Sequence, residues 1–444
     1  MKYHIENFGC QMNEHDMEKV ASLLRSAGII PAEDIEAADV VIVNTCCVRQ
    51  KAEQKFYSLM GRLKHLKREN GTILGMTGCI AQLEKDAIVK RLPFLDFSLG
   101  PSSLHRITEA IDAAAGKKRF LEFADNGCSL TLHVRPRAVA GAVKAHVTVM
   151  KGCDNFCSYC IVPYVRGREV SRESADVIDE VRSLAAAGVK EVTLLGQNVN
   201  SYNRGKNDLS FPELLNRINA IDGIERIRFV TSHPKDMSDK LIDCFGRLEK
   251  LCEHIHLPFQ SGSDRILGLM NRGYTAAQYM EKVEALRERC PGMACSADCI
   301  VGFPGETEED FEGTMALIEK VRFDGLFSFC YSPRRNTAAS RLPDEVDQEV
   351  AHTRLLRLQA AQKVITWKKN RELEGSTVEV LVEGRSKNSP EDLTGRTRTN
   401  KVVNFGVAEE MVGRLAYVEV VKGHANSLKA SPPTVKEVAS CSRR

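Results

Sequence analysis

Residues 151–160 read KGCDNFCSYC and bring three cysteines, Cys153, Cys157 and Cys160, close together in the chain. Structural zinc sites and ferredoxin clusters usually take four protein ligands, and no His or Cys follows at a standard zinc spacing. Three thiolates can instead hold an iron–sulfur cubane and leave one iron without a protein ligand. The spacing therefore predicts a [4Fe–4S] cluster with one open iron, against the alternatives of a structural metal or simply buried thiols.

An open iron can chelate a small molecule through an amino and a carboxylate group. S-adenosylmethionine carries that pair, and a reduced cluster can pass it one electron and cleave its C–S bond. The aromatic Tyr159 before the last cysteine supports the same interpretation. The stretch thus predicts S-adenosylmethionine as a cofactor and radical chemistry as the reaction type.

Six segments between about residues 141 and 369 read as strands separated by helices: AHVTVMKGC, EVTLLGQ, RIRFVTS, HIHLPFQ, CSADCIVGF and GLFSFCYS. This alternation predicts a partial (β/α)6 barrel whose working face is built from the loops after the strands. The cysteine stretch follows the first strand, on that face. Positions at strand ends on the same face give the expected cofactor-binding residues Tyr159, Gln197, Gln260, Ser261 and Val301.

GFPGE at 302–306 lacks the Lys-Ser/Thr of a phosphate-binding loop, so ATP binding is not predicted. A turn near an adenine and an ordinary strand-to-helix turn both stay open. His254 and His256 alternate on one side of a strand, and core packing is preferred to zinc binding there. Packing is also the preferred role of the cysteines in apolar or helical stretches, which are Cys244, Cys252, Cys290, Cys295, Cys299 and Cys330.

The first third of the chain alternates strands and helices, which predicts a doubly wound parallel sheet. Its three strands end at Cys10, Cys46 and Cys79. Because ligands gather at the carboxyl ends of parallel strands, these cysteines are expected side by side, holding an auxiliary [4Fe–4S] cluster. Separately buried cysteines are the alternative. Cys47 should face the other way if its strand continues, so it is expected to be a packing residue.

Residues from about 375 to 436 form short alternating strands broken by glycines, which predicts a small β-barrel. Basic residues crowd one part of it and suggest nucleic-acid binding, with a solvated charged surface as the alternative. The expected RNA-binding residues are Arg385, Lys387, Arg396, Arg398 and Lys401. A basic connector at about 117–139 precedes the segment of the predicted partial (β/α)6 barrel. A solvated linker is preferred there to a contact surface.

The 444 residues carry a net charge of +3, which neither requires nor excludes a nucleic-acid partner. No secretory signal or membrane-spanning run is visible, so a cytoplasmic location and no membrane partner are expected. In a reducing compartment, 15 cysteines indicate metal ligands or buried thiols and no disulfide framework.

The chain resembles the radical S-adenosylmethionine methylthiotransferases, in particular the branch of tRNA-2-methylthio-N6-dimethylallyladenosine synthases. The matching motifs span the whole chain in order: FGCQMN, NTCCVR, TGCIAQ, GCDNFCSYCIVPYVRGRE, LLGQNVNSY, TSHPKDM, HLPFQSGSD, MNRGYT, IVGFPGET and GRTRTNKVVNF. The resemblance implies an N-terminal methylthiotransferase domain (1–117), a linker (118–138), a radical core (139–371), a TRAM RNA-binding domain (372–436) and a tail (437–444).

The resemblance also implies the reaction. One S-adenosylmethionine methylates a sulfur on the auxiliary cluster at Cys10, Cys46 and Cys79. A second, bound at Cys153, Cys157 and Cys160, yields the 5′-deoxyadenosyl radical for methylthio insertion at C2 of adenosine 37. The expected partners are tRNA with an isopentenylated adenosine 37 in its anticodon stem-loop, a reducing electron donor and a sulfur donor, and the enzyme is expected to be a monomer.

Related branches modify threonylcarbamoyl-adenosine of tRNA or an aspartate of a ribosomal protein, and these are the alternative activities. An RNA-binding iron–sulfur redox sensor is the non-enzymatic alternative, although it would not need an open coordination site. The sequence departs from the family at Arg335 and Asn336, where members have Pro-Gly after YSPR. The shape of that last barrel loop is therefore left open, as is competition between Cys47 and Cys46 for iron.

Overall fold

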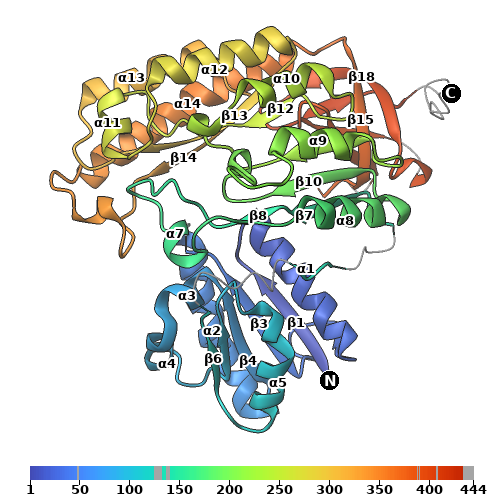
Figure 1. The fold of residues 1–444 in the computed structure, drawn as a ribbon, viewed down its shortest axis with the longest axis vertical. Helices are drawn as coiled ribbons and strands as arrows, with labels where there is room; N and C mark the ends of the chain where they lie inside the picture. The colour runs from blue at the N-terminus through green and yellow to red at the C-terminus, as the bar shows by residue number, and fades with distance from the viewer. Residues whose placement is uncertain are drawn as a thin grey trace.

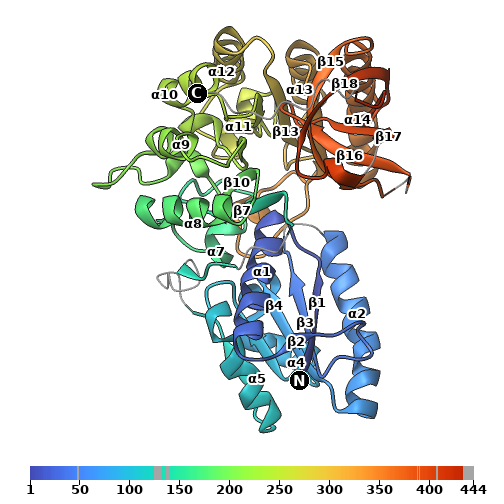
Figure 2. The ribbon, with the colours of Figure 1, turned by 90° about the vertical axis from the view of Figure 1, so that its right-hand side faces the viewer.

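The computed structural model describes residues 1–47, 50–124, 133–136, 141–387, 389, 391–406 and 409–433. These form an N-terminal α/β domain, a partial barrel and a small C-terminal β-barrel (Figure 1). Two perpendicular views place the N-terminal domain at one end of the molecule and the C-terminal β-barrel beside the partial barrel (Figures 1 and 2). The predicted tail, 437–444, lies outside the described residues. Within the described ranges, no helix has the length and apolarity needed to cross a bilayer.

The N-terminal domain is a wholly parallel sheet in the order β2-β1-β3-β4-β5-β6. Its strands are β1 (Lys2–Asn7), β2 (Ile30–Pro31), β3 (Val40–Thr45), β4 (Ile73–Gly78), β5 (Phe97–Leu99) and β6 (Phe120–Glu122). Its helices are α1 (Gln11–Ser26), α2 (Gln50–Asn70), α3 (Cys79–Glu84), α4 (Ile88–Arg91) and α5 (Ile107–Ala115). Strand β6 lies inside the segment predicted as a linker and extends the sheet by one edge strand.

Alternating side chains of β3 enter two different hydrophobic clusters. Val41 and Val43 pack with Phe56 of α2, whereas Val40 and Ile42 pack with Val20 of α1. Both faces of the sheet are therefore covered by helices, which is why β3 reads as a continuous β-branched run. The predicted doubly wound parallel sheet is confirmed.

The partial barrel contains the six predicted parallel strands in two hydrogen-bonded groups, β11-β10-β7 and β12-β13-β14. The strands are β7 (Lys144–Thr148), β10 (Glu191–Leu195), β11 (Arg226–Phe229), β12 (His254–His256), β13 (Ala294–Val301) and β14 (Gly325–Cys330). A parallel bridge between Ile227 and Leu251 joins the two groups. A short ribbon of β8 (Met150–Lys151) and β9 (Val170–Ser171) brackets the cysteine loop and α7 (Val162–Val165).

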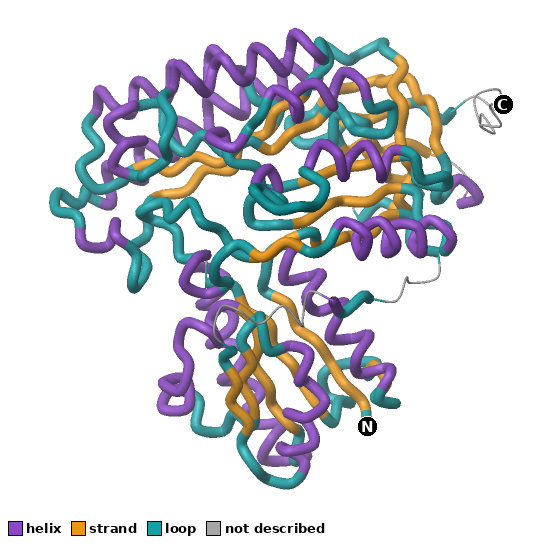
Figure 3. The backbone as a smooth tube through the Cα atoms, in the orientation of Figure 1, coloured by secondary structure: helices purple, strands orange, loops and turns teal. Residues whose placement is uncertain are grey.

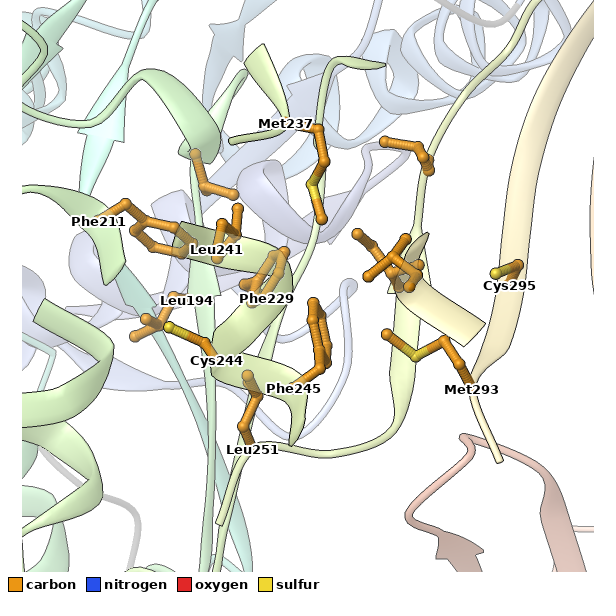
Figure 4. Packing of buried hydrophobic residues seen from close by; sticks show 14 of the residues in the cluster. Leu194, Phe211, Phe229, Met237, Leu241, Cys244, Phe245, Leu251, Met293 and Cys295 are labelled. Carbon is orange, nitrogen blue, oxygen red and sulfur yellow. The ribbon is translucent and has the colours of Figure 1, made fainter. Parts of the chain in front are cut away.

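Helices cover the outer face of these strands (Figure 3). They are α8 (Ser174–Ala186), α9 (Phe211–Asn219), α10 (Asp239–Arg247), α11 (Asp264–Leu269), α12 (Ala276–Arg289), α13 (Glu308–Val321) and α14 (Gln348–Arg371). The largest hydrophobic core fills the space between strands and helices, where Leu194 and Phe229 meet Phe211, Leu241 and Phe245 (Figure 4). Cys244, Cys252, Cys290, Cys295 and Cys299 are buried, as their apolar surroundings predicted.

The C-terminal domain is a closed five-stranded barrel in the order β15-β16-β17-β19-β18. Its strands are β15 (Thr377–Arg385), β16 (Asp392–Thr397), β17 (Val402–Gly406), β18 (Leu415–Gly423) and β19 (Leu428–Ala430). Alternating residues such as Val380, Val382, Val403 and Phe405 fill its interior. Closure pairs the edge strands of the sheet with each other, as is typical of small β-barrels.

The loop after β14 contains a tight turn at Arg335 and Asn336. The Thr337 amide donates to the Arg334 carbonyl at 3.2 Å, and Asn336 has φ of +70°. A turn with a positive φ at its third residue is the one for which Pro-Gly is best suited. Asn is among the few other residues that tolerate this conformation, so the chain keeps the turn without the family's Pro-Gly.

The Asn336→Ala protein is expected to lose about 1 kcal/mol of stability, because a Cβ without a polar group disfavours the left-handed conformation. Asn336→Gly should be tolerated and is the matched control. The single tryptophan, Trp367 of α14, allows urea unfolding of the barrel to be followed by fluorescence. Equal unfolding midpoints for the Ala and Gly proteins would contradict this interpretation of the turn.

Candidate functional site

The loop of Cys153, Cys157 and Cys160 is closed on itself by backbone contacts. The Cys153 amide donates to the Gly167 carbonyl at 3.1 Å, and the Cys160 amide donates to the Cys157 carbonyl at 2.9 Å. Gly152 has φ of +76°, and a Cβ there would overlap the Arg168 carbonyl. The glycine before the first cysteine is therefore required by a close backbone approach.

Arg272 is the cationic partner of this loop. Its Nη1 lies 3.3 Å from the Cys157 sulfur and 3.4 Å from the Tyr159 hydroxyl, and its Nη2 donates to the Pro258 carbonyl at 2.7 Å. Burial raises the pKa of the Cys153 thiol to about 11 and that of the Cys160 thiol to about 12. Thiols in such surroundings ionise readily only when a metal binds them.

His233 completes the surroundings of Cys157, with its Nε2 atom 3.8 Å from the sulfur. Burial, together with nearby Arg272, lowers the pKa of His233 to about 2, so the ring is neutral. A neutral ring adds no charge beside the cysteines, and the fixed positive charge of the site comes from Arg272.

The residues predicted to bind the cofactor take different positions. Gln197 accepts a hydrogen bond from the Gly152 amide at 2.5 Å and so fixes the cysteine loop. Gln260 has φ of +68°, and its side-chain oxygen is buried with no hydrogen-bond partner among the described residues. The Ser261 hydroxyl accepts from the Ser263 amide at 3.2 Å. The Val301 side chain is buried in the core beneath the helices, which leaves only its backbone at the strand end.

Further buried acceptors without a partner among the described residues lie after the barrel strands. They include the side-chain oxygens of Asn198 and Asn200 after β10 and of Ser232 after β11. Unsatisfied buried polar atoms are rare and mark a missing ligand or water. Together with Gln260, they suit a ligand with amino and hydroxyl donors, such as S-adenosylmethionine.

Cys10, Cys46 and Cys79 lie at the carboxyl edge of the N-terminal sheet. Cys46 directly follows β3, Cys79 directly follows β4, and Cys10 is the residue before α1. A hydrogen bond joins Cys10 to Cys46 and, with a contribution from Arg166, lowers the pKa of the Cys10 thiol to about 6. The parallel register predicted from the sequence thus brings strand ends from three remote segments together.

Three asparagines hold these strand ends. Asn44 Nδ2 donates to the Asn7 side chain at 3.1 Å and to the Asn13 carbonyl at 3.1 Å. Asn13 in turn accepts from the Cys10 thiol at 3.3 Å. Gly78 has φ of +97°, and a Cβ there would overlap the Asn44 side chain. The sequence-based expectations did not include this network, although Asn13 in FGCQMN and Asn44 in NTCCVR stand close to the cysteines and are a usable signal.

Cys47 does not point away from the other cysteines. Strand β3 ends at Thr45, so the alternation on which that expectation rested stops before Cys47. Cys47 packs in the cluster with Phe56, and its thiol also hydrogen-bonds to Cys79, lowering the pKa of Cys79 to about 7. The same contact and burial raise the pKa of Cys47 well above its ordinary value. Four thiols therefore lie at this edge.

Arg166 joins the segment after the compact cysteine group to the N-terminal domain. It follows α7, six residues after Cys160, and donates to Asp16 Oδ2 at 2.9 Å and to the Asn13 side chain at 3.3 Å. The side chain is 7% exposed, which means that a charged residue of the barrel is buried against the N-terminal domain. Because its partners are remote in sequence, no local pattern predicts this contact, and the same holds for Arg272.

Among the described residues, no three or more His, Cys, Asp or Glu side chains are arranged to hold a single metal ion. Ligands of a cubane bind different irons, so they stand further apart than ligands of one ion. Both groups consist of thiols, which are the soft ligands that iron–sulfur clusters use. The donor sets therefore fit clusters, whereas a mononuclear zinc site is not formed.

Of the five residues predicted to bind RNA, three form ion pairs with acidic residues and two are exposed. Arg398 pairs with both carboxylate oxygens of Glu253 at 2.7 Å, and Lys401 pairs with Asp324 at 3.1 Å. Both contacts join the C-terminal barrel to the partial barrel. Arg396 pairs with Glu383 at 3.4 Å within its own domain. Arg385 and Lys387 are exposed.

Two buried arginines of β11 donate hydrogen bonds to backbone carbonyls of the C-terminal barrel next to Arg398. Arg226 donates to the Arg396 carbonyl at 2.6 Å, and Arg228 donates to the Thr397 carbonyl at 2.7 Å. Arg398 and Lys401 therefore help to attach the C-terminal domain, with their charges already paired. The basic cluster in the sequence mixes residues of an interdomain contact with the exposed residues Arg385 and Lys387.

Three family models match the chain in order. Residues 2–100 match the Uncharacterized protein family UPF0004, residues 147–318 the Radical SAM superfamily and residues 371–432 the TRAM domain. The solved structure of the radical S-adenosylmethionine methyltransferase TsrM from Kitasatospora setae, with cobalamin and a [4Fe–4S] cluster bound, is similar in fold. It has a TM-score of 0.58 at 15% identity, over 76% of this chain and 77% of that chain.

Curated relatives match over almost the whole length. The tRNA-2-methylthio-N(6)-dimethylallyladenosine synthase of Geobacter sulfurreducens is 52% identical over 96% of this chain and 96% of its own. The synthase of the same name from Syntrophus aciditrophicus is 49% identical over 96% of this chain and 93% of its own. At this identity and coverage, the chain belongs to the family of tRNA-2-methylthio-N(6)-dimethylallyladenosine synthases.

Proposed function

We propose that this protein inserts a methylthio group at C2 of N6-dimethylallyladenosine 37 in tRNA by a radical S-adenosylmethionine mechanism. One observation supports this most strongly: two groups of cysteines lie on adjoining domains, and Arg166, six residues after Cys160, contacts Asn13 and Asp16 beside the second group. A radical enzyme that only cleaves S-adenosylmethionine needs one such group. A second group gives the transferred sulfur a place to bind.

The proposed ligands are Cys153, Cys157 and Cys160 for the radical cluster and Cys10, Cys46 and Cys79 for the auxiliary cluster. When bound, the clusters supply one electron for cleavage of S-adenosylmethionine and a site for the sulfur to be transferred. The contribution of the chain is placement and electrostatics. Arg272 stabilises negative charge at Cys157, and Arg166 does the same at Cys10 and Cys79.

Burial supports the same function. Gln197, His233 and Arg272 hold the compact cysteine loop in place, and Cys157 is its buried cysteine, which limits side reactions there. A polar reaction mechanism would not readily functionalise an unactivated aromatic C–H bond, whereas a radical mechanism can. The proposed cofactor contacts are Gln260, Ser261, Tyr159 and the backbone of Val301, and Gln197 acts through the cysteine loop.

The proposed partners are tRNA, an electron donor and a sulfur donor, and the enzyme is proposed to act as a cytoplasmic monomer. Arg385 and Lys387 are the proposed RNA contacts on the C-terminal barrel, because they are exposed. Arg396, Arg398 and Lys401 are proposed to position that barrel through their ion pairs. Phosphate contacts of this kind supply affinity and orientation without reading sequence.

Mass spectrometry of tRNA nucleosides tests the function. The reconstituted protein, with S-adenosylmethionine, a reductant and sulfide, is expected to convert isopentenylated tRNA to its 2-methylthio product. Unmodified tRNA from a strain without the isopentenyl group is the control and should give no product. A product found on threonylcarbamoyl-adenosine instead would refute the proposed substrate.

A further inference from the structure

Strand β14 has two faces with different surroundings. Leu326 and Cys330 pack against the core beneath the helices, and Ser328 accepts a hydrogen bond from Gln359 of α14 at 3.3 Å. Phe327 and Phe329 occupy the alternate positions, so they point to the opposite face, away from α14. They are 55% and 40% exposed, which makes them the most exposed phenylalanines among the described residues.

The neighbouring strand continues the same face. In the parallel register, Phe327 pairs with Asp298 and Phe329 pairs with Ile300. The His256 ring of β12 lies 6.0 Å from the Phe327 ring, and its Nε2 atom lies 3.5 Å from an Asp298 oxygen. We call these five residues the inner wall: His256, Asp298, Ile300, Phe327 and Phe329. Figure 1 shows that helices α12, α13 and α14 cover the other face of these strands.

The inner wall is continuous with the compact cysteine group. Ile300 packs against the small hydrophobic cluster that also contacts Tyr159, the residue directly before Cys160. A base resting on Phe329 and Ile300 would therefore lie next to the loop proposed to generate the radical. Proximity of this kind is the main contribution that a protein makes to such a reaction.

Exposed phenylalanines inside a barrel call for an explanation, because burying such a side chain is strongly favourable. Apolar surface that stays open beside polar groups is typical of a ligand site. The substrate proposed above has matching chemistry, since adenine stacks on aromatic rings and the dimethylallyl group is wholly apolar. A phosphate or sugar would gain nothing from this surface.

Asp298 adds a charge preference to the inner wall. Its side chain is 33% exposed, and His256 is its one ion-pair neighbour in the described part of the chain. A carboxylate here accepts a hydrogen bond from the N6–H of a substituted adenine. It also repels a substituent that carries its own carboxylate, such as threonylcarbamoyl.

We infer that Phe327 and Phe329 bind the dimethylallyl-substituted adenine and that Asp298 selects against an acidic N6 substituent. This inference rests on the proposed function, of which it names the specificity-determining residues. The inner wall then explains how one radical scaffold distinguishes a neutral apolar substituent from a charged one.

The test compares binding of two anticodon stem-loop RNAs, isopentenylated and unmodified, to the reconstituted holoenzyme. In Phe327→Ala and Phe329→Ala, the preference for the isopentenylated RNA should fall about tenfold, because each ring covers part of the apolar substituent. Phe329→Leu should keep most of the preference. Leu356→Ala is the matched control, since Leu356 is 53% exposed on α14 and should leave the preference unchanged.

Asp298→Asn should raise the affinity for a threonylcarbamoyl-adenosine RNA relative to the isopentenylated one. Unchanged preferences in both phenylalanine variants would overturn the inference, even if the unmutated enzyme makes the methylthio product. Failure of the unmutated enzyme to make that product would refute the proposed function instead, so the two failures are distinguishable.

Discussion

The Cys157→Ala protein is expected to release no 5′-deoxyadenosine from S-adenosylmethionine, a loss of at least about a thousandfold. Cys157 is the most deeply placed cysteine of its group, and it contacts both Arg272 and His233. Removing its thiolate leaves two ligands, too few to hold a cubane in place. The buried Arg272 charge also loses its sulfur partner. The measurement is chromatography of the nucleoside products under reducing, anaerobic conditions.

Cys244→Ala is the matched control for this change. Cys244 is fully buried in the barrel core (Figure 4), so the substitution removes a thiol from the same domain without touching either cysteine group. It is expected to keep cleavage. Retained 5′-deoxyadenosine formation in Cys157→Ala, or its loss in both proteins, would contradict the assignment of the compact group.

The Cys10→Ala protein should separate the two halves of the reaction. Cys10 lies at the edge of the N-terminal sheet, and its bonds run to Cys46 and Asn13. We expect iron and sulfide content to fall by about half, since one of two clusters is lost. Cleavage of S-adenosylmethionine should remain largely intact because the compact group is built by another domain, whereas the methylthio product should disappear.

These expectations are tested by measuring iron content, S-adenosylmethionine cleavage and methylthio product on the same preparation. Unchanged iron content would show that Cys10 is not a ligand. Loss of cleavage together with insertion would indicate damage to the interface through Asn13 and Arg166. Cys47→Ala extends the test, because its thiol touches Cys79 and its removal shows whether the fourth thiol supports the cluster.

Much of this architecture could be predicted from local patterns. Hydrophobic alternation and the β-branched run of β3 specified a buried parallel sheet, and repeated strand–helix units specified the barrel. The placement of Cys10, Cys46 and Cys79 followed from one topological rule, because parallel strands share a carboxyl edge. The direction of Cys47 could not be predicted in this way, because β3 ends at Thr45, two residues earlier.

The sequence by itself determined the six-cysteine pattern, the three domains and the type of chemistry, because ligand spacing and strand periodicity are local properties of the chain. Only the tertiary structure decided which charges are paired across a domain boundary. Arg398 and Lys401 look like RNA contacts in the sequence but meet Glu253 and Asp324 across a domain boundary. Arg166 and Arg272 gave no local signal, yet they lie against the cysteines. Their role depends on partners 100 or more residues away, and only folding brings such charges together.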